Sequence, residues 1–288
     1  MGTAIMEIME RRKSVRTYEQ TPIREEAHAS VMEYLAREEN LRGPFGGKAS
    51  VEWITVKGGV AEATGVKLGA YGVIKNPQAY LVGAVQNGKT ALLEFGYIFQ
   101  KLILFATGLG LGTCWMGGTF NRKSFSREIE LAPGELIPCI SPLGYASGKQ
   151  RLLDSTMRYL AKANQRKPWE ELFYDAGFGR MLTREAADRL AAPLEMVRLG
   201  PSASNKQPWR VVLSEDRKQA HFYLQLTPNY SGNKLGFEMQ RIDIGIAACC
   251  FELACRELGI SGGWIQQDPM LNAPGPQPAE YMLSYSLS

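Results

Sequence analysis

The sequence predicts an α+β protein made of two tandem repeats, residues 1–155 and 156–288, each arranged around one central helix. Residues 91–107 are apolar on almost every side, which is typical of a buried helix, and residues 238–258 form its counterpart. A loop of turn-forming residues leads into a strand ahead of each helix. Tryptophan and glycine positions then recur in the same order in both halves, with a period of about 150 residues, far longer than a solenoid unit.

The first half begins with two amphipathic helices. The first covers residues 3–11, and the second starts at Thr21-Pro22, where proline suits a first turn, and stops near Asn40. The inward faces carry Ile5, Ile8 and Met9 in the first helix and Val31, Tyr34 and Leu35 in the second. A glycine-rich loop then enters a strand within residues 43–56, and residues 79–85 form a buried strand.

The central helix of the first half ends in a glycine-rich segment, residues 108–120. We do not expect this helix to cross a membrane, because it is short of ~20 apolar residues and carries Glu94 and Lys101. The glycines do not form a dinucleotide-binding fingerprint either, since they follow a helix instead of a strand and their spacing differs. Helix capping and close backbone approach explain them better. A strand at 137–143 follows.

The second half repeats this order. Its predicted elements are helices at 168–176 and 183–198, a loop at 200–208, strands at 209–213 and 221–226, the central helix, and a last strand near 281–285. In the second of these helices Leu190, Leu194 and Val197 face inward. The loop is rich in Pro, Ser and Asn, which leaves its polar groups available to a ligand. The alternative is a plain surface turn before a strand.

Matched positions support the repeat, and mismatched ones are informative. The matched pairs are Pro44 with Pro201, Glu94 with Asp243, Gly96 with Gly245, and Trp115 with Trp264. The first half carries the basic run Arg11–Arg16, for which we find no counterpart in the second. The second half keeps Ser, Asn and Gln in its loop, whereas the first has lost the Asn and Gln. Each half therefore holds what the other lacks.

Composition excludes several classes of function. Apolar residues make up 45% and charged residues 22%, which is typical of a globular protein. A net charge of +4 does not suggest nucleic-acid binding, and only the basic run Arg11–Arg16 supports that function. Five cysteines without a CxxC pair and two histidines predict neither a disulfide framework nor a metal site. Cys114 is expected to be a small buried thiol. The N-terminus lacks the apolar stretch of a secretory signal, so we expect a reduced, cytoplasmic protein without membrane partners.

Four motifs resemble the FMN-dependent nitroreductase family, and together they span nearly the whole chain. They are Arg12–Arg16, Leu111–Gly118, Leu143–Tyr145 with Lys149 and Arg151, and Pro201–Trp209. The resemblance implies a mainly antiparallel sheet in each half and halves packed as a pseudo-twofold dimer. The usual family member is a homodimer whose sites combine the basic motif of one subunit with the loop of the other. The fused chain is therefore expected to be a monomer with one FMN site and an empty second site.

The resemblance also assigns site residues. Arg12, with Lys149 or Arg151, would hold the FMN phosphate, which needs clustered cations. If residues 14–16 are extended, Ser14 and Arg16 project to the same side, and Arg16 reaches the N1–O2 edge of the flavin. Gly117 or Gly118 would present a backbone N–H to N5. The candidate cofactor-binding residues are Arg12, Lys13, Ser14, Arg16, Tyr71 (equally a core residue), Met116, Gly117, Gly118, Lys149, Arg151, Pro201, Ser202, Ala203, Ser204 and Asn205.

The implied function is that of an FMN-dependent oxidoreductase. Hydride would pass from NAD(P)H to FMN N5 and then, in a ping-pong cycle, to a nitroaromatic, quinone or similar small acceptor. The flavin performs the chemistry, supported by Arg16 and Gly117, so no catalytic side chain and no metal are expected. Gly117 stands where some nitroreductases place Glu, which leaves the preferred donor and acceptor open. The alternative is a flavin-binding module, a carrier or sensor, with little turnover.

Overall fold

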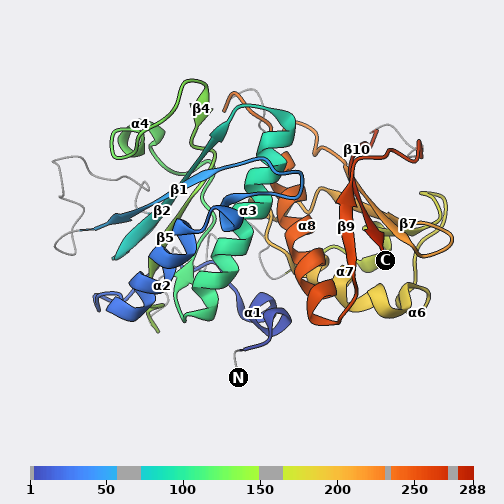
Figure 1. Cartoon of the computed structure of the whole chain (residues 1–288), viewed down its shortest axis with the longest axis horizontal. Coiled ribbons are helices and arrows are strands. Elements are labelled where there is room, and N and C mark those ends of the chain that lie inside the picture. Colours follow the sequence, from blue (N-terminus) through green and yellow to red (C-terminus); the bar gives the residue numbers. More distant parts are fainter. Residues whose placement is uncertain (1–2, 57–72, 149–164, 231–234, 272–277) are drawn as a thin grey trace.

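Two β-sheets flank a central pair of long helices, as Figure 1 shows. The computed structural model describes residues 3–56, 73–148, 165–230, 235–271 and 278–288. The helices are α3 (Lys89–Gly108) and α8 (Met239–Glu257), which pack along each other. The predicted α+β class and both central helices are confirmed. The predicted boundary at residue 155 lies outside the described residues.

The first sheet has the strand order β1-β2-β5-β3, with β4 also pairing with β2, and all its pairs are antiparallel. Its strands are β1 (Ser50–Thr55), β2 (Ala79–Gln86), β3 (Gly112–Thr113), β4 (Glu135–Leu136) and β5 (Ile140–Gly144). Strand β2 is buried along nearly its whole length, because α3 covers one face and a smaller apolar cluster around Phe125 covers the other. Strand β3 packs against α3, near the end of that helix.

The second sheet has the order β6-β7-β8-β10-β9. Its strands are β6 (Phe173–Asp175), β7 (Trp209–Leu213), β8 (Gln219–Leu224), β9 (Gly262–Ile265) and β10 (Glu280–Leu287). Only the edge pair β6–β7 is parallel; the others are antiparallel, as expected for this half. Strand β7 is fully buried and is entered directly from the loop at 200–208. The sheet therefore fixes one end of that loop.

Two glycines let the central helices approach at backbone distance. A Cβ atom at Gly96 of α3 would overlap the carbonyl oxygen of Ile242, and one at Gly245 of α8 would overlap that of Leu93. The contact is reciprocal, because residues 93 and 96 on one helix meet 245 and 242 on the other. By length and composition α3 is apolar enough to cross a membrane, yet 72% of its apolar window is buried inside the protein. It is thus placed as a core helix.

The remaining helices of the described residues are shorter. They are α1 (Ile5–Arg11), α2 (Glu25–Ala36), η1 (Glu38–Leu41), α4 (Arg122–Phe125), η3 (Trp169–Glu171), α6 (Arg184–Ala187), η4 (Asp188–Leu190), α7 (Ala191–Leu199) and η5 (Ala203–Asn205). The two predicted N-terminal helices are present, although α2 starts only at Glu25 and ends at Ala36, and the separate 3₁₀ turn η1 occupies the residues around Asn40.

Two helix predictions in the second half are corrected. Residues 168–176 are not a helix: after a single 3₁₀ turn, Phe173–Asp175 pair in parallel with β7, and this tertiary pairing overrides the local pattern. Residues 183–198 are broken between α6 and α7, where Asp188 has a φ of 49°. Pro193 lies in the first turn of α7, where its missing N–H is harmless, whereas in a continuous helix it would remove a hydrogen bond. The predicted inward residues Leu190, Leu194 and Val197 are all buried.

Candidate functional site

The basic segment that follows α1 is extended, which meets the condition under which Ser14 and Arg16 project to the same side. The Arg12 N–H still donates to Ile8 O at 2.9 Å and closes the helix. Beyond it, the Val15 N–H donates to Thr113 O at 2.8 Å, and the backbone of Ser14 pairs in parallel with Thr113 of β3. Arg16 accepts a hydrogen bond at its carbonyl from the Lys75 N–H at 2.9 Å. The segment is therefore held along the edge of the first sheet.

Arg12 carries a buried cation without a carboxylate partner among the described residues. Its Nη1 atom is buried and has no hydrogen-bond acceptor there. The thiols of Cys114, next to β3, and Cys250, on α8, lie beside it, and burial lowers the pKa of the guanidinium. A desolvated charge is costly unless a counter-charge accompanies it, so the surroundings of Arg12 favour a bound anion. Cys114 is buried, in agreement with its predicted role.

Arg166 is a site residue that the sequence analysis missed. It donates from Nη1 to Asn205 Oδ1 at 2.8 Å and from Nη2 to Leu199 O at 3.0 Å. Burial, the charge of Arg12 and the charge of Arg198 lower its pKa to about 10. Arg166 and Lys167 form a short basic pair within the second half, so the expectation of no counterpart to the basic run was too strict.

Arg16 and Lys13 lie in different surroundings. The Nη1 atom of Arg16 is buried and, like that of Arg12, has no acceptor among the described residues. Its charge acts on Tyr18, whose hydroxyl donates to Val15 O at 2.7 Å, although burial remains the main reason why the pKa of Tyr18 is raised. Lys13 is exposed. Arg16 therefore provides a second buried guanidinium group in this segment, besides that of Arg12, that could bind a ligand.

The loop at 200–208 uses most of its polar side chains to hold its own shape. Ser202 Oγ accepts the Gln207 N–H at 2.9 Å, and Asn205 Nδ2 donates to Gln165 O at 2.6 Å. Ser204 Oγ lies 3.0 Å from the Tyr230 hydroxyl. Ser204, Asn205 and Gln207 all have φ near +50° (48°, 55° and 47°), a conformation that side chains rarely adopt. Such strain persists only where surrounding contacts impose it and is common at ligand sites.

Each central helix anchors one loop through a buried carboxylate. Asp243 Oδ1 accepts the Ala203 N–H at 3.0 Å, and burial raises the pKa of this carboxyl well above its usual range. In the first half Glu94 Oε1 accepts the Phe45 N–H at 2.8 Å, and burial again raises the carboxyl pKa. Glu94 and Asp243 are the residues that the sequence comparison paired. Pro201 precedes the anchored turn and is half-buried.

In the glycine segment after β3, residues 116–118, one glycine is covered by a neighbouring side chain and the other is open. Met116 exchanges both backbone hydrogen bonds with Ile140, and its side chain is buried in the core, so the structure favours packing over a ligand contact for it. A Cβ at Gly117 would lie 2.6 Å from Met239 Cε and 3.2 Å from Cys139 Sγ. Gly118 is exposed and has no atom within 4 Å of a Cβ position. Met239 thus occupies the space that a side chain at 117 would need.

We expect Gly117→Ala to lower the free energy of unfolding by about 1 kcal/mol, because the added methyl group must displace the Met239 thioether. Gly118→Ala places its methyl group in open space and serves as the matched control. Urea unfolding of Gly117→Ala, Met239→Ala and the double variant measures the coupling. Purely additive costs would show that Met239 does not restrict position 117.

One face of α8 brings the three parts of the candidate site together. Near its start the helix packs against Gly117; one turn later it binds the N–H of Ala203; and two turns farther on it lies beside Arg12. The α8 residues at these contacts are Met239, Asp243 and Cys250. Their spacing of four and seven residues places them on one stripe, about 16 Å long at 1.5 Å per residue. Tyr71, Lys149 and Arg151 lie outside the described residues.

A separate cavity of about 510 Å³ lies between α2 and β1 and contains none of the predicted site residues. It is lined by Gln20, Pro22, Ile23, Glu25, His28, Trp53, Thr55, Val56 and Gln78. In the described ranges no three His, Cys, Asp or Glu side chains are grouped closely enough to hold a metal ion. The stripe along α8, and not this cavity, is therefore the candidate functional site.

Comparisons with known proteins agree on one family. A family model described as "Putative TM nitroreductase" matches residues 4–255. A "putative nitroreductase" structure from Thermotoga maritima MSB8 is 17% identical, covers 100% of this chain and 95% of its own, and has a TM-score of 0.62. This likeness shows a shared fold over the whole length of the chain. No curated protein matches the sequence.

Smaller nitroreductases match about half of the chain. A nitroreductase family protein from Clostridium novyi NT is 20% identical over 53% of this chain and 91% of its own, with a TM-score of 0.40. An FMN-dependent nitroreductase from Clostridium difficile R20291 is 15% identical over 50% of this chain and 88% of its own, with a TM-score of 0.38.

Proposed function

Because this chain belongs to the family described as "Putative TM nitroreductase", we propose that it is an FMN-dependent oxidoreductase. It takes hydride from NAD(P)H and, in a ping-pong cycle, reduces a nitroaromatic, quinone or similar small acceptor. The observation that carries the proposal is the stripe along α8. It aligns the glycine pair Gly117–Gly118, the strained loop around Ala203, and the cation of Arg12, which has no carboxylate partner in the described part of the chain. An elongated ligand with an anionic end suits this order.

The chain's residues bind and orient the cofactor. Arg12 and Arg166 hold the phosphate, to which two guanidinium groups can donate forked hydrogen bonds. Arg16 supplies a fixed positive charge where the reduced flavin gains negative charge, which favours reduction. The loop at 200–208 covers the ring from the second half. When bound, FMN supplies the hydride chemistry at N5, so no side chain of the protein need act as acid or base.

We propose further that the chain is a fused pseudo-dimer that works as a monomer, with its boundary near residue 155. The reciprocal contacts of Gly96 and Gly245 support this, because a two-fold axis makes each partner meet the other through the same residues. The matched anchors Glu94 and Asp243 support it as well. Cytoplasmic location stays a prediction from the sequence.

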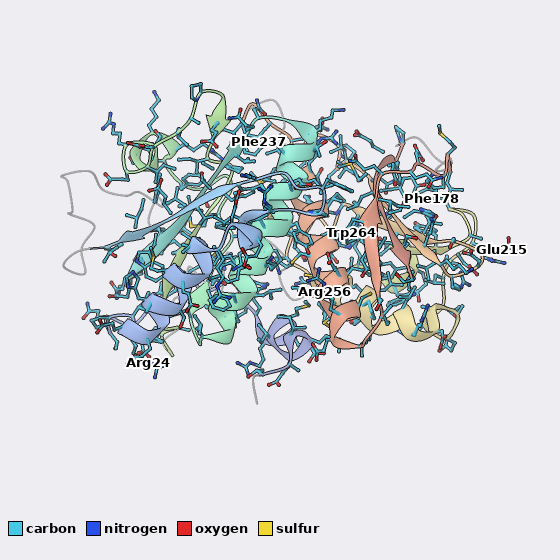
Figure 2. The ribbon with its side chains drawn as sticks, in the orientation of Figure 1. Arg24, Phe178, Glu215, Phe237, Arg256 and Trp264 are labelled. Atoms are coloured by element: carbon cyan, nitrogen blue, oxygen red, sulfur yellow. The ribbon has the colours of Figure 1, made fainter. Side chains whose placement is uncertain are left out.

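The second symmetry-related site is proposed to be lost. Phe45 stands where the second half has Ser202, and its side chain, like that of Trp264, packs against the core cluster of the second half. Trp264, labelled in Figure 2, belongs to β9, and its indole N–H donates to Glu252 Oε2 of α8 at 2.6 Å. An apolar side chain in this place leaves no polar wall for a flavin.

Titration with FMN tests this function. We expect one FMN bound per chain, with a flavin visible spectrum, and steady NADH or NADPH oxidation in the presence of menadione or a nitrofuran. Two FMN per chain would contradict the single site. Protein that takes up no FMN would overturn the proposal, and FMN binding without turnover would indicate a carrier or sensor instead.

A further inference from the structure

Arg122 lies behind the glycine segment and is held on several sides. It is the first residue of α4, and its guanidinium carbon lies 4.6 Å from the centre of the Phe120 ring and 5.5 Å from that of Phe237. Phe237 precedes α8 and is labelled near the upper end of the central helix pair in Figure 2. Both rings are buried. The guanidinium is therefore fixed between an aromatic ring from each half.

The hydrogen bonds of Arg122 go to backbone carbonyl groups. Nε donates to Ile137 O at 3.0 Å, and Nη2 donates to Pro138 O at 3.1 Å and to Gly117 O. No carboxylate of the described residues pairs with it, and burial lowers its pKa while the nearby Cys139 thiol raises it. A positive charge thus lies directly behind the peptide that joins Gly117 to Gly118.

The geometry of that peptide fixes where its other end points. A trans peptide is planar, and its C=O and N–H groups point in opposite directions. Because Arg122 binds the Gly117 carbonyl, the Gly118 N–H points away from Arg122. Gly118 is exposed and has open space around its Cβ position, whereas Met239 covers Gly117. The Gly118 N–H therefore faces the open side of the segment.

We propose that Arg122 is a positioning residue that fixes the Gly117–Gly118 peptide so that the Gly118 N–H is the donor to flavin N5. Its charge also polarises this peptide, because hydrogen bonds in a chain strengthen one another. Both effects withdraw electron density from N5 and so favour hydride transfer to it, which shifts the balance toward the reduced flavin. The inference rests on the proposed function and adds the residue that sets the flavin's redox balance.

The test compares the binding of oxidised and reduced FMN to Arg122→Met. We expect reduced FMN to bind about tenfold more weakly relative to oxidised FMN than in the unaltered protein, which corresponds to a midpoint potential about 30 mV lower for a two-electron couple. Lys123→Met, which removes an exposed charge from the same helix, is the matched control and should leave the ratio unchanged.

A second pair of variants acts on the other end of the same peptide. Gly118→Pro removes the N–H, whereas Gly118→Ala keeps it, so the proline variant alone should lower the ratio. This pair decides the question if Arg122→Met does not fold. Unchanged ratios in Arg122→Met or, where it does not fold, in Gly118→Pro would overturn the inference. Failure of the unaltered protein to bind FMN would instead overturn the proposed function.

Discussion

Gly245→Ala is expected to lower the free energy of unfolding by about 3 kcal/mol or more, the upper range for overpacking in a core. Helix propensity alone predicts the opposite, because alanine is favoured over glycine by about 1 kcal/mol inside a helix. The added methyl group, however, would overlap the Leu93 carbonyl oxygen across the helix pair. Backbone on the facing helix cannot rotate away as a side chain can, so α3 and α8 must separate.

Gly96→Ala should behave in the same way, since its methyl group meets the backbone of Ile242. Gly108→Ala in α3 is the matched control, because the nearest atom there is the terminal Cδ1 of Ile8 at 3.1 Å, which can move. Urea unfolding of the three variants measures the difference. Equal stability of Gly245→Ala and Gly108→Ala would show that the two helices do not meet at backbone distance.

Local patterns were enough to predict the central helices and most strands, but not the elements that long-range pairing decides. Residues 91–107 are apolar on nearly every side, and this alone places α3 in the core. Residues 173–175 form a strand only because β7, more than 30 residues later, lies beside them. Pro193 was a local signal for the break before α7 that could have been weighed.

The candidate site shows the same division. Sequence motifs point to Arg12, the glycine segment and the loop at 200–208, because each carries an unusual run of residue types. Met239 and Arg122 carry no such signal. Their roles follow from contacts across the fold: Met239 covers Gly117 from a helix more than 100 residues away, and Arg122 binds the carbonyl of the same glycine. Neither contact is indicated by a pattern of residue types in the sequence.

Arg12→Met is expected to weaken FMN binding roughly 100-fold while leaving riboflavin binding within about threefold. A hydrogen bond to a charged group contributes about 1.5–3 kcal/mol, and a lost phosphate contact at this buried cation lies at the upper end of that range. Riboflavin lacks the phosphate and has no use for the guanidinium. Fluorescence titration with both flavins measures the two affinities.

The FMN-free protein should respond to Arg12→Met with the opposite sign. Arg12 is a buried cation without a carboxylate among the described residues, and replacing buried charges by apolar groups of similar volume is often neutral or stabilising. We therefore expect an unchanged or higher melting temperature without FMN and a lost FMN-induced increase. Arg11→Met is the control, since Arg11 is exposed and pairs with Glu7 at 3.1 Å. An equal loss of FMN and riboflavin affinity, with a less stable free protein, would mean that Arg12 holds the fold and not the phosphate.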